Sequence, residues 1–199
     1  MISFTLNVAE LEAQAEACAE ALRRGGVAAL PTETVYGLAT LWGNDAGRQR
    51  IFELKHRAEN KPLQMLAADM AMARAAGVLV DPRLERLAAA FFPGALTVVC
   101  SAAGSVTIGL RIPDHAFTLA VLRRLGAPLA ATSANRSGEP PGADAAAAVA
   151  GLDGSPDLLV DGGPIADAQA STVISLTGPT PQLLRAGPLP FDRILAALG

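Results

Sequence analysis

The stretch "ALTVVCSAAGSVTIGLRI", residues 95–112, decides the fold class. It reads as two apolar strands, "ALTVVCS" and "VTIGLRI", joined by the small-residue turn "AAGS". In much of the chain, strand-like runs alternate with helical ones, which alone would favour a parallel sheet. Two strands that follow one another directly require an antiparallel pair. The sequence therefore predicts an α/β (α+β) fold with an open, twisted, mixed β-sheet flanked by helices.

The other elements follow from hydrophobic periodicity and from glycine and proline stops. Helices are predicted at 8–24, 45–55, 69–76, 82–92, 114–125, 143–151 and 191–198, and further strands at 27–31, 62–67, 127–133, 157–161, 171–176 and 182–187. A turn-rich stretch, "NRSGEPPGAD", occupies 135–144. Only about 55 residues follow it, which is few for an independent domain. We therefore predict one domain over residues 1–199.

Composition limits the classes of function. The net charge is −3 and the pI is about 5.4, which disfavours binding of nucleic acid through bulk positive charge. Cys18 and Cys100 lack metal-ligand spacing, and with so few cysteines and no recognisable leader we expect buried thiols in a cytoplasmic protein. No apolar run is long enough to span a membrane.

Several catalytic signatures are missing from the sequence. There is no P-loop, no dinucleotide-binding glycine motif after a strand and no GxSxG nucleophile elbow. The two histidines are too few for a catalytic zinc site. We therefore expect no metal held by protein side chains.

Both lysines of the chain fall in "ELKHRAENKPLQ", residues 53–64, although the chain also has 14 arginines. Lys55, Arg57 and Lys61 concentrate positive charge near the end of a predicted helix. One interpretation is a solvated helix C-terminus, where the dipole favours cations. The other is a site for an anionic ligand, with phosphate favoured because the compact ammonium group is a common phosphate binder. The residues alone leave both open.

A polar turn follows the predicted strand in "ALPTETVYGLAT", residues 29–40. It carries Thr32, Thr34 and Tyr36, the only tyrosine. Open α/β sheets often bind ligands where a strand opens into such a turn. An ordinary turn capped by hydroxyl groups is the alternative.

Two later segments combine polar groups with turns. In "ATSANRSGEPPG" a strand runs into Ser133 and Asn135, and small polar residues can close around a ligand or simply form a surface turn. In "ASTVISLTGPTPQLLRAG" a two-strand hairpin would bring Ser171 and Arg185 to one edge of the sheet. Arg185 by itself is more typical of a solvated strand terminus than of a ligand contact.

An arginine interrupts the apolar strand in "VTIGLRIPDH", residues 106–115. Thr107 and Arg111 are four residues apart, so they point to the same face of a strand. A buried arginine needs an anionic partner. That partner is either a ligand or an internal carboxylate, and the sequence does not separate the two.

Six short motifs, taken together and in order, resemble the YrdC-type (TsaC) family of threonylcarbamoyl-AMP synthases. They are "PTETVYGL", "KHRAENKPL", "PGALT", "LRIP", "SANRSG", and "STV" followed by "LLRAG". Each is weak alone, but six in register over about residues 10–187 are specific. The resemblance implies a YrdC/RibB-like sheet with a deep positive cavity. It also leads us to expect a single YrdC-like domain without the additional C-terminal domain of longer family members.

The resemblance implies an activity. Such a nucleotidyltransferase, an L-threonylcarbamoyladenylate synthase, condenses L-threonine, bicarbonate and ATP into threonylcarbamoyl-AMP and pyrophosphate, with Mg²⁺ carried by ATP and no organic cofactor. Downstream tRNA-modification proteins would accept the adenylate, and contact with tRNA or double-stranded RNA is a further expectation. The alternative is a non-catalytic member that binds double-stranded RNA in ribosome maturation. A hydrogenase-maturation relative is disfavoured, because those chains are much longer and carry zinc-finger-like cysteines.

Residue roles also follow from the resemblance. Threonine binding is implied for Thr34, Arg111, Ser133 and Ser171, with Thr32 and Tyr36 as further candidates. ATP binding and catalysis are implied for Lys55, Arg57 and Lys61, and additional ATP contacts for Thr107, Asn135 and Arg185. The sequence departs from the family pattern at positions that bear on the adenine and ribose contacts, namely Ala58, Ala143 and Ser175.

Overall fold

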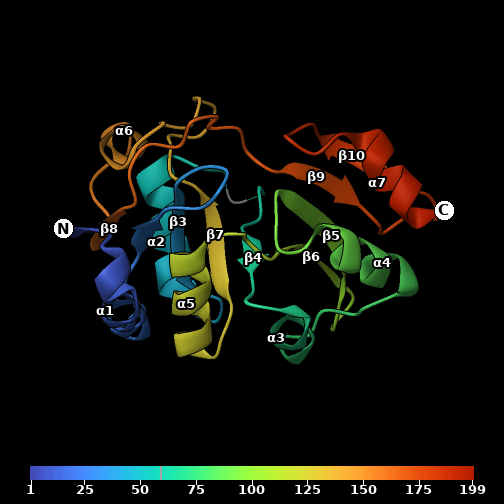
Figure 1. Ribbon diagram of the computed structural model, residues 1–199, viewed down its shortest axis with the longest axis horizontal. Coiled ribbons are helices and arrows are strands. Elements are labelled where there is room, and N and C mark those ends of the chain that lie inside the picture. The colour runs from blue at the N-terminus through green and yellow to red at the C-terminus, as the bar shows by residue number, and fades with distance from the viewer. Residues whose placement is uncertain (59) are drawn as a thin grey trace.

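The computed structural model describes residues 1–58 and 60–199, and its strands form one sheet (Figure 1). Within these residues the sheet has ten strands in the order β1-β8-β2-β3-β7-β4-β6-β5-β9-β10. The strands are β1 (Ile2–Thr5), β2 (Ala28–Leu30), β3 (Gly37–Leu41), β4 (Gln64–Leu66), β5 (Leu96–Ala102), β6 (Val106–Arg111), β7 (Leu129–Ser133), β8 (Leu158–Asp161), β9 (Thr172–Ser175) and β10 (Gln182–Arg185).

Seven α-helices connect or flank these strands in the described residues. They are α1 (Leu11–Arg23, preceded by the 3-10 turn Val8–Glu10), α2 (Asp45–Lys55), α3 (Met70–Ala75), α4 (Pro82–Phe91), α5 (Ala116–Leu125), α6 (Ala145–Ala150) and α7 (Phe191–Leu198). Each lies inside or within a residue or two of a range expected from periodicity. The predicted helical positions are therefore confirmed.

The sheet is mixed, as predicted from residues 95–112. Strands β5 and β6 pair antiparallel with Val98 opposite Leu110, whereas β4 with β6 and β5 with β9 are parallel pairs. The β5–β6 turn places Gly104 and Ser105 at φ values of 77° and 59°. Both residues have the left-handed φ that tight hairpin turns require, and glycine adopts it at little cost.

The two halves of the sheet are covered differently (Figure 1). The half formed by β1, β8, β2, β3 and β7 buries one face against α1 and α5 and the other against α2 and α6. The half formed by β4, β6, β5 and β9 packs one face on α3, α4 and α7. Within the described residues, no helix forms a hydrophobic core cluster with the other face of this half of the sheet. That face is therefore available for a site.

Two strands were not predicted. Strand β1 has exposed or half-exposed residues throughout and lies at an edge of the sheet, so its pattern carries no core signal. Strand β3 begins at Gly37, inside the segment interpreted as a polar turn, and pairs antiparallel with β2. The polar turn therefore connects β2 to its neighbouring strand β3.

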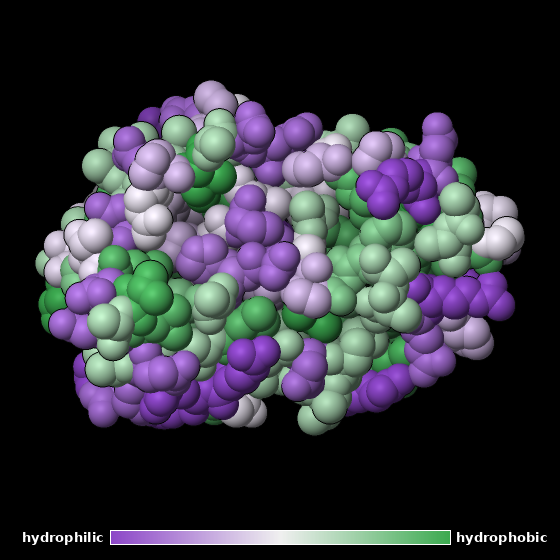
Figure 2. Space-filling view, viewed as in Figure 1, coloured by the Kyte–Doolittle hydropathy of each residue, from purple (hydrophilic) through white to green (hydrophobic). Residues whose placement is uncertain are grey.

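The surface is divided by polarity. In Figure 2 hydrophobic residues gather over the half of the molecule that contains α4 and β5, and hydrophilic residues gather near the lower ends of α1 and α5. Arg124 of α5 bridges Glu12 and Glu16 of α1, each at 2.8 Å. No helix among the described residues is both long and apolar enough to cross a membrane.

The start of α2 depends on the absence of a side chain at Gly47. Asn44 caps the helix by accepting from the Gly47 amide at 3.1 Å, and its Nδ2 donates to Thr40 Oγ1 at 3.0 Å. A Cβ atom on Gly47 would overlap both Thr40 Oγ1 and Asn44 Nδ2. Helix α2 therefore lies against β3 without strain only with glycine here.

We predict that Gly47→Ala lowers the free energy of unfolding by about 1–3 kcal/mol, because the added methyl group overpacks the cap. Urea denaturation followed by circular dichroism measures the change. Gly43→Ala is the matched control, since its Cβ would meet no atom within 4 Å. Equal unfolding midpoints for the two variants would contradict the interpretation.

Candidate active site

A cavity of about 290 Å³ opens on the face of β4, β6, β5 and β9 that the helices leave uncovered. Its floor is formed by alternate residues of the β5–β6 hairpin, Thr97 and Val99 on β5 and Thr107, Gly109 and Arg111 on β6. The residues between them are buried on the opposite face, among them Leu96, Val98, Ile108 and Leu110. The period of two therefore gives each strand a core face and a cavity face, and Thr107 and Arg111 share a face as predicted.

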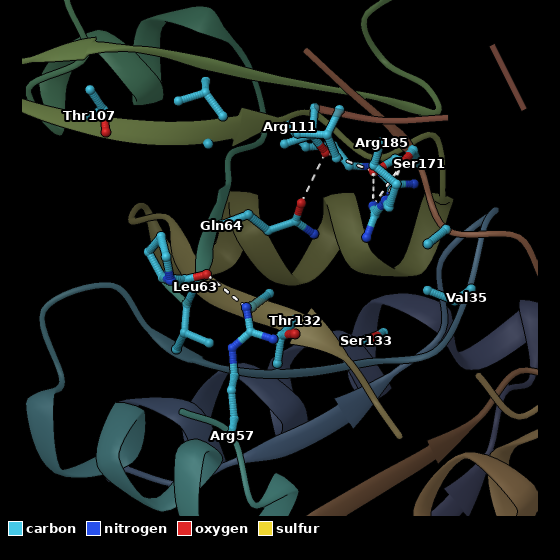
Figure 3. Close-up of a pocket in the computed structure, with 17 residues that line it drawn as sticks. Val35, Arg57, Leu63, Gln64, Thr107, Arg111, Thr132, Ser133, Ser171 and Arg185 are labelled. Carbon is cyan, nitrogen blue, oxygen red and sulfur yellow. Dashed lines mark hydrogen bonds between the residues drawn. The ribbon is translucent and has the colours of Figure 1, made fainter. Parts of the chain in front are cut away.

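Three arginines from distant parts of the chain reach this cavity (Figure 3). Arg57 lies on one side, and Arg111 and Arg185 lie on the other. Polar groups from further elements complete the lining, including Gln64, Thr132, Ser133 and Ser171. The cavity thus combines positive charge with hydroxyl and amide groups, which suits an anionic ligand that carries hydrogen-bonding groups.

Arg111 is held on the protein side by two contacts. Its side chain is 2% exposed, its Nε donates to the Gly94 carbonyl at 3.2 Å, and its Nη2 lies 2.7 Å from Glu33 Oε1. The sequence left open whether the partner of this arginine is an internal carboxylate or a ligand. The structure shows an internal carboxylate while the same guanidinium also lines the cavity.

A chain of hydrogen bonds links Arg185 to the floor of the cavity. Arg185 Nη2 donates to the Ser171 carbonyl at 2.8 Å and to Ser171 Oγ at 3.2 Å. Ser171 Oγ and Thr97 Oγ1 are 2.8 Å apart, and Thr97 Oγ1 donates to Gln64 Oε1 at 3.0 Å. The predicted β9–β10 hairpin, which pairs antiparallel, brings Ser171 and Arg185 together. Thr97 and Gln64 were not predicted as candidates, although they end "PGALT" and follow "KPL".

Lys55 faces a loop and does not line the cavity. It is 1% exposed, and its Nζ donates to the carbonyls of Ser133 and Asn135. Its own carbonyl accepts from the Ser137 amide at 2.9 Å. Burial, and to a lesser extent the charge of Arg57, lower the pKa of Lys55 to about 8. In this structure Lys55 therefore ties the end of α2 to the loop that follows β7.

Of Lys55, Arg57 and Lys61, only Arg57 lines the cavity. Helix α2 ends at Lys55, and His56 turns the chain with a left-handed φ of 47°. Arg57 then donates from Nε to the Lys61 carbonyl at 2.8 Å and from Nη2 to the Pro62 carbonyl at 3.0 Å. Burial and the charge of Arg185 lower the pKa of Arg57. Lys61 is exposed beside Pro62, which itself lines the cavity.

The hydroxyl groups of the 32–36 turn point into the protein. Thr32 Oγ1 donates to the Val35 carbonyl at 2.6 Å and lies 3.0 Å from Thr34 Oγ1. Tyr36 donates from its hydroxyl to the Gly163 carbonyl at 2.7 Å, and burial raises its pKa. Of this turn, only Val35 lines the cavity. Roles for Thr32, Thr34 and Tyr36 in binding stay predictions.

Asn135 shapes the loop after β7. Its Nδ2 donates to the carbonyls of Arg136 at 2.8 Å and Glu139 at 2.6 Å, while its Oδ1 is buried without a hydrogen-bond partner among residues 1–58 and 60–199. Asn135 does not line the cavity, whereas Ser133 does. Within the same described part of the chain, no group of three or more histidine, cysteine or acidic residues could hold a metal ion.

We predict that the Lys55 amine titrates near pH 8, because desolvation favours its neutral form. With lysine labelled by ¹³C at Cε, the protein should give two lysine resonances, and their pH dependence can be followed by NMR. Lys61→Arg removes one of them and so assigns the other. A Lys55 midpoint at the ordinary lysine value of 10.5 would contradict the burial argument.

Comparisons with known proteins agree with this geometry. The Sua5_yciO_yrdC family model, described as "Telomere recombination", matches residues 20–187. A threonylcarbamoyl-AMP synthase of Bacillus subtilis is 35% identical over 208 residues, covering 100% of this chain and 60% of the relative. A putative threonylcarbamoyl-AMP synthase of Mycobacterium tuberculosis is 32% identical, covering 90% of this chain and 86% of the relative.

The structure is also similar to a solved one. The crystal structure of Pyrococcus abyssi Sua5 complexed with L-threonine superposes with a TM-score of 0.90 and 32% identity, covering 100% of this chain and 60% of that chain. The fold and its cavity thus define an α/β protein of the Sua5 type. The chain belongs to the Sua5/YciO/YrdC family, and it spans 60% of the length of both the Bacillus and the Pyrococcus proteins.

Proposed function

We propose that this protein is a threonylcarbamoyl-AMP synthase, a nucleotidyltransferase that uses L-threonine, bicarbonate and ATP and releases pyrophosphate. The observation that carries the proposal is the convergence of Arg57, Arg111 and Arg185 on one cavity. A triphosphate and an amino-acid carboxylate bound side by side require such a concentration of charge. The names of the relatives and the L-threonine bound to the Pyrococcus protein support the same activity.

The threonine end of the site lies at Arg111. This guanidinium is fixed by Gly94 and Glu33 and lines the cavity, so it can bind the substrate carboxylate without first being ordered. The hydroxyl groups of Ser133 and Ser171 line the same cavity and supply partners for the amine and the side-chain hydroxyl of threonine. Thr34 can join them only if its hydroxyl turns away from Thr32.

The ATP end of the site lies toward Arg57 and Arg185. Together with Thr107 on the floor they bind the triphosphate with the Mg²⁺ that ATP carries, and Lys61 extends the positive charge beyond the rim. Lys55 serves this end by fixing the backbone at Ser133 and Asn135. A direct contact from Lys55 to phosphate stays a prediction, and it requires Nζ to leave one of those carbonyls.

The chemistry needs no protein nucleophile. The threonine amine and bicarbonate form a carbamate with loss of water, and an enclosed cavity protects this unstable species. A carbamate oxygen then attacks the α-phosphorus, the bond to the β-phosphate bridging oxygen breaks, and pyrophosphate leaves. Arg57 and Arg185 stabilise the charge that develops on the phosphoryl oxygens, while Arg111 orients the attacking group.

The product is an activated acyl group, so a further protein must consume it. We propose that tRNA-modification proteins take up the adenylate and that any contact of the protein with RNA occurs in that transfer. The net charge of −3 gives no bulk attraction for a polyanion.

We predict pyrophosphate release that depends on all three substrates. Omitting threonine, bicarbonate or ATP in turn should each reduce the rate to background, because the carbamate forms only when both carbon substrates are present. An enzyme-coupled pyrophosphate assay measures the rate. Salt-dependent binding of double-stranded RNA without threonine-dependent release would instead favour the non-catalytic reading and overturn the proposal.

A second prediction uses the cavity floor. Gly109 lies between Thr107 and Arg111, and a Cβ there would meet Thr97 Cγ2 at 3.4 Å, an ordinary contact. Gly109→Ala should therefore be tolerated, whereas Gly109→Val, a good strand former, fills the cavity and should lower kcat/KM for threonine at least about tenfold. Full activity of the folded valine variant would place the reaction elsewhere.

A further inference from the structure

Glu33 is the carboxylate that faces Arg111, and it is not among the residues for which the sequence predicts a role. Both of its carboxylate oxygens are buried and accept no hydrogen bond in the described part of the chain. Oε1 lies 2.7 Å from Arg111 Nη2, but that nitrogen too lacks the alignment of a hydrogen bond. Buried carboxylates are ordinarily stabilised by several donors. The charge of Glu33 is therefore balanced by the charge of Arg111.

Of the other titratable groups near this pair, His115 adds no positive charge, whereas Arg185 does. His115 has a buried Nδ1 with no partner in the described residues. Burial lowers its pKa more than the charges of Glu33 and Asp114 raise it, which favours the neutral imidazole. Burial and, to a lesser extent, the charge of Arg111 lower the pKa of Arg185, which donates to the neutral carbonyl and hydroxyl of Ser171 and keeps its positive charge. Glu33 and Arg111 thus form a locally neutral pair at the wall of the cavity.

The ion pair with Glu33 limits which ligands Arg111 can bind. Its Nε is engaged by Gly94 and its Nη2 by Glu33, which leaves Nη1 without a partner among the described residues. A carboxylate that binds there shares one guanidinium with Glu33, so these three groups form a cluster with a net charge of −1 beside the positive charge of Arg185. Such a cluster is costly where water is excluded. An amino acid brings an ammonium group on the adjacent carbon and keeps the cluster neutral.

We propose that Glu33 determines specificity by making the cavity select zwitterionic amino acids over carboxylates that lack an α-amino group. The proposal rests on the proposed function, in which Arg111 binds the threonine carboxylate. Glu33 acts on the ligand through its negative charge and needs no direct contact with it. The selection therefore depends on the charge of Glu33 and not merely on the shape of its side chain.

The test compares L-threonine with 3-hydroxybutyrate, which is threonine without its amino group, by isothermal titration calorimetry on the full chain. Wild type should bind threonine at least about tenfold more tightly, and Glu33→Gln, which keeps the shape and removes the charge, should reduce that preference at least about tenfold. Glu33→Asp should retain it. Asp114→Asn is the matched control, because it removes an exposed carboxylate near His115 that has no ion pair with Arg111 in the described residues.

The outcomes are distinct. A preference that falls in Glu33→Gln and persists in Glu33→Asp and Asp114→Asn supports the proposal. Affinities for both ligands that fall by one common factor show that Glu33 merely supports Arg111, and overturn it. Equal affinities of the two ligands for wild type also overturn it, whatever the folding of the variants. A wild type that binds no threonine and releases no pyrophosphate refutes the proposed function itself.

Discussion

The structure depends on a charged side chain held in the middle of a sheet. Arg111 is 2% exposed at the end of β6, next to β4 and within reach of the turn that carries Glu33. Burying a guanidinium is costly without an anionic partner. That need brings the 32–36 turn against the second half of the sheet. The ion pair therefore joins the two halves at the place where the cavity forms.

The fold was predictable from the sequence wherever buried and exposed residues alternate with the period of a strand or a helix. The β5–β6 hairpin could be read because its core residues alternate with residues such as Thr97 and Thr107, and because glycine and serine mark its turn. Strand β1 could not be read, since a short edge strand with exposed side chains leaves no periodic signal. Strand β3 was hidden because its first residue, Gly37, ends a polar turn, and only the pairing with β2 and β7 makes it a strand.

Several residues of the site could be predicted from the sequence, but the directions of their side chains could not. Strand periodicity puts Thr107 and Arg111 on one face, and hairpin pairing brings Arg185 to Ser171, so these positions follow from local rules. The direction of the Lys55 ammonium group does not, because it is set by two carbonyls about 80 residues away in the sequence. Glu33 escaped attention for a similar reason, since a carboxylate in a turn is usually solvated.

The scarcity of lysine has a practical consequence for anyone who handles this protein. Lys55 is buried, so of the two lysine side chains it is Lys61, next to Pro62 of the cavity lining, that reagents acylating primary amines can reach. Coupling the protein to a biosensor chip or a dye through amines would direct the attachment toward its own entrance. Anchoring through an engineered tag placed away from Lys61 and Pro62 would leave the entrance open.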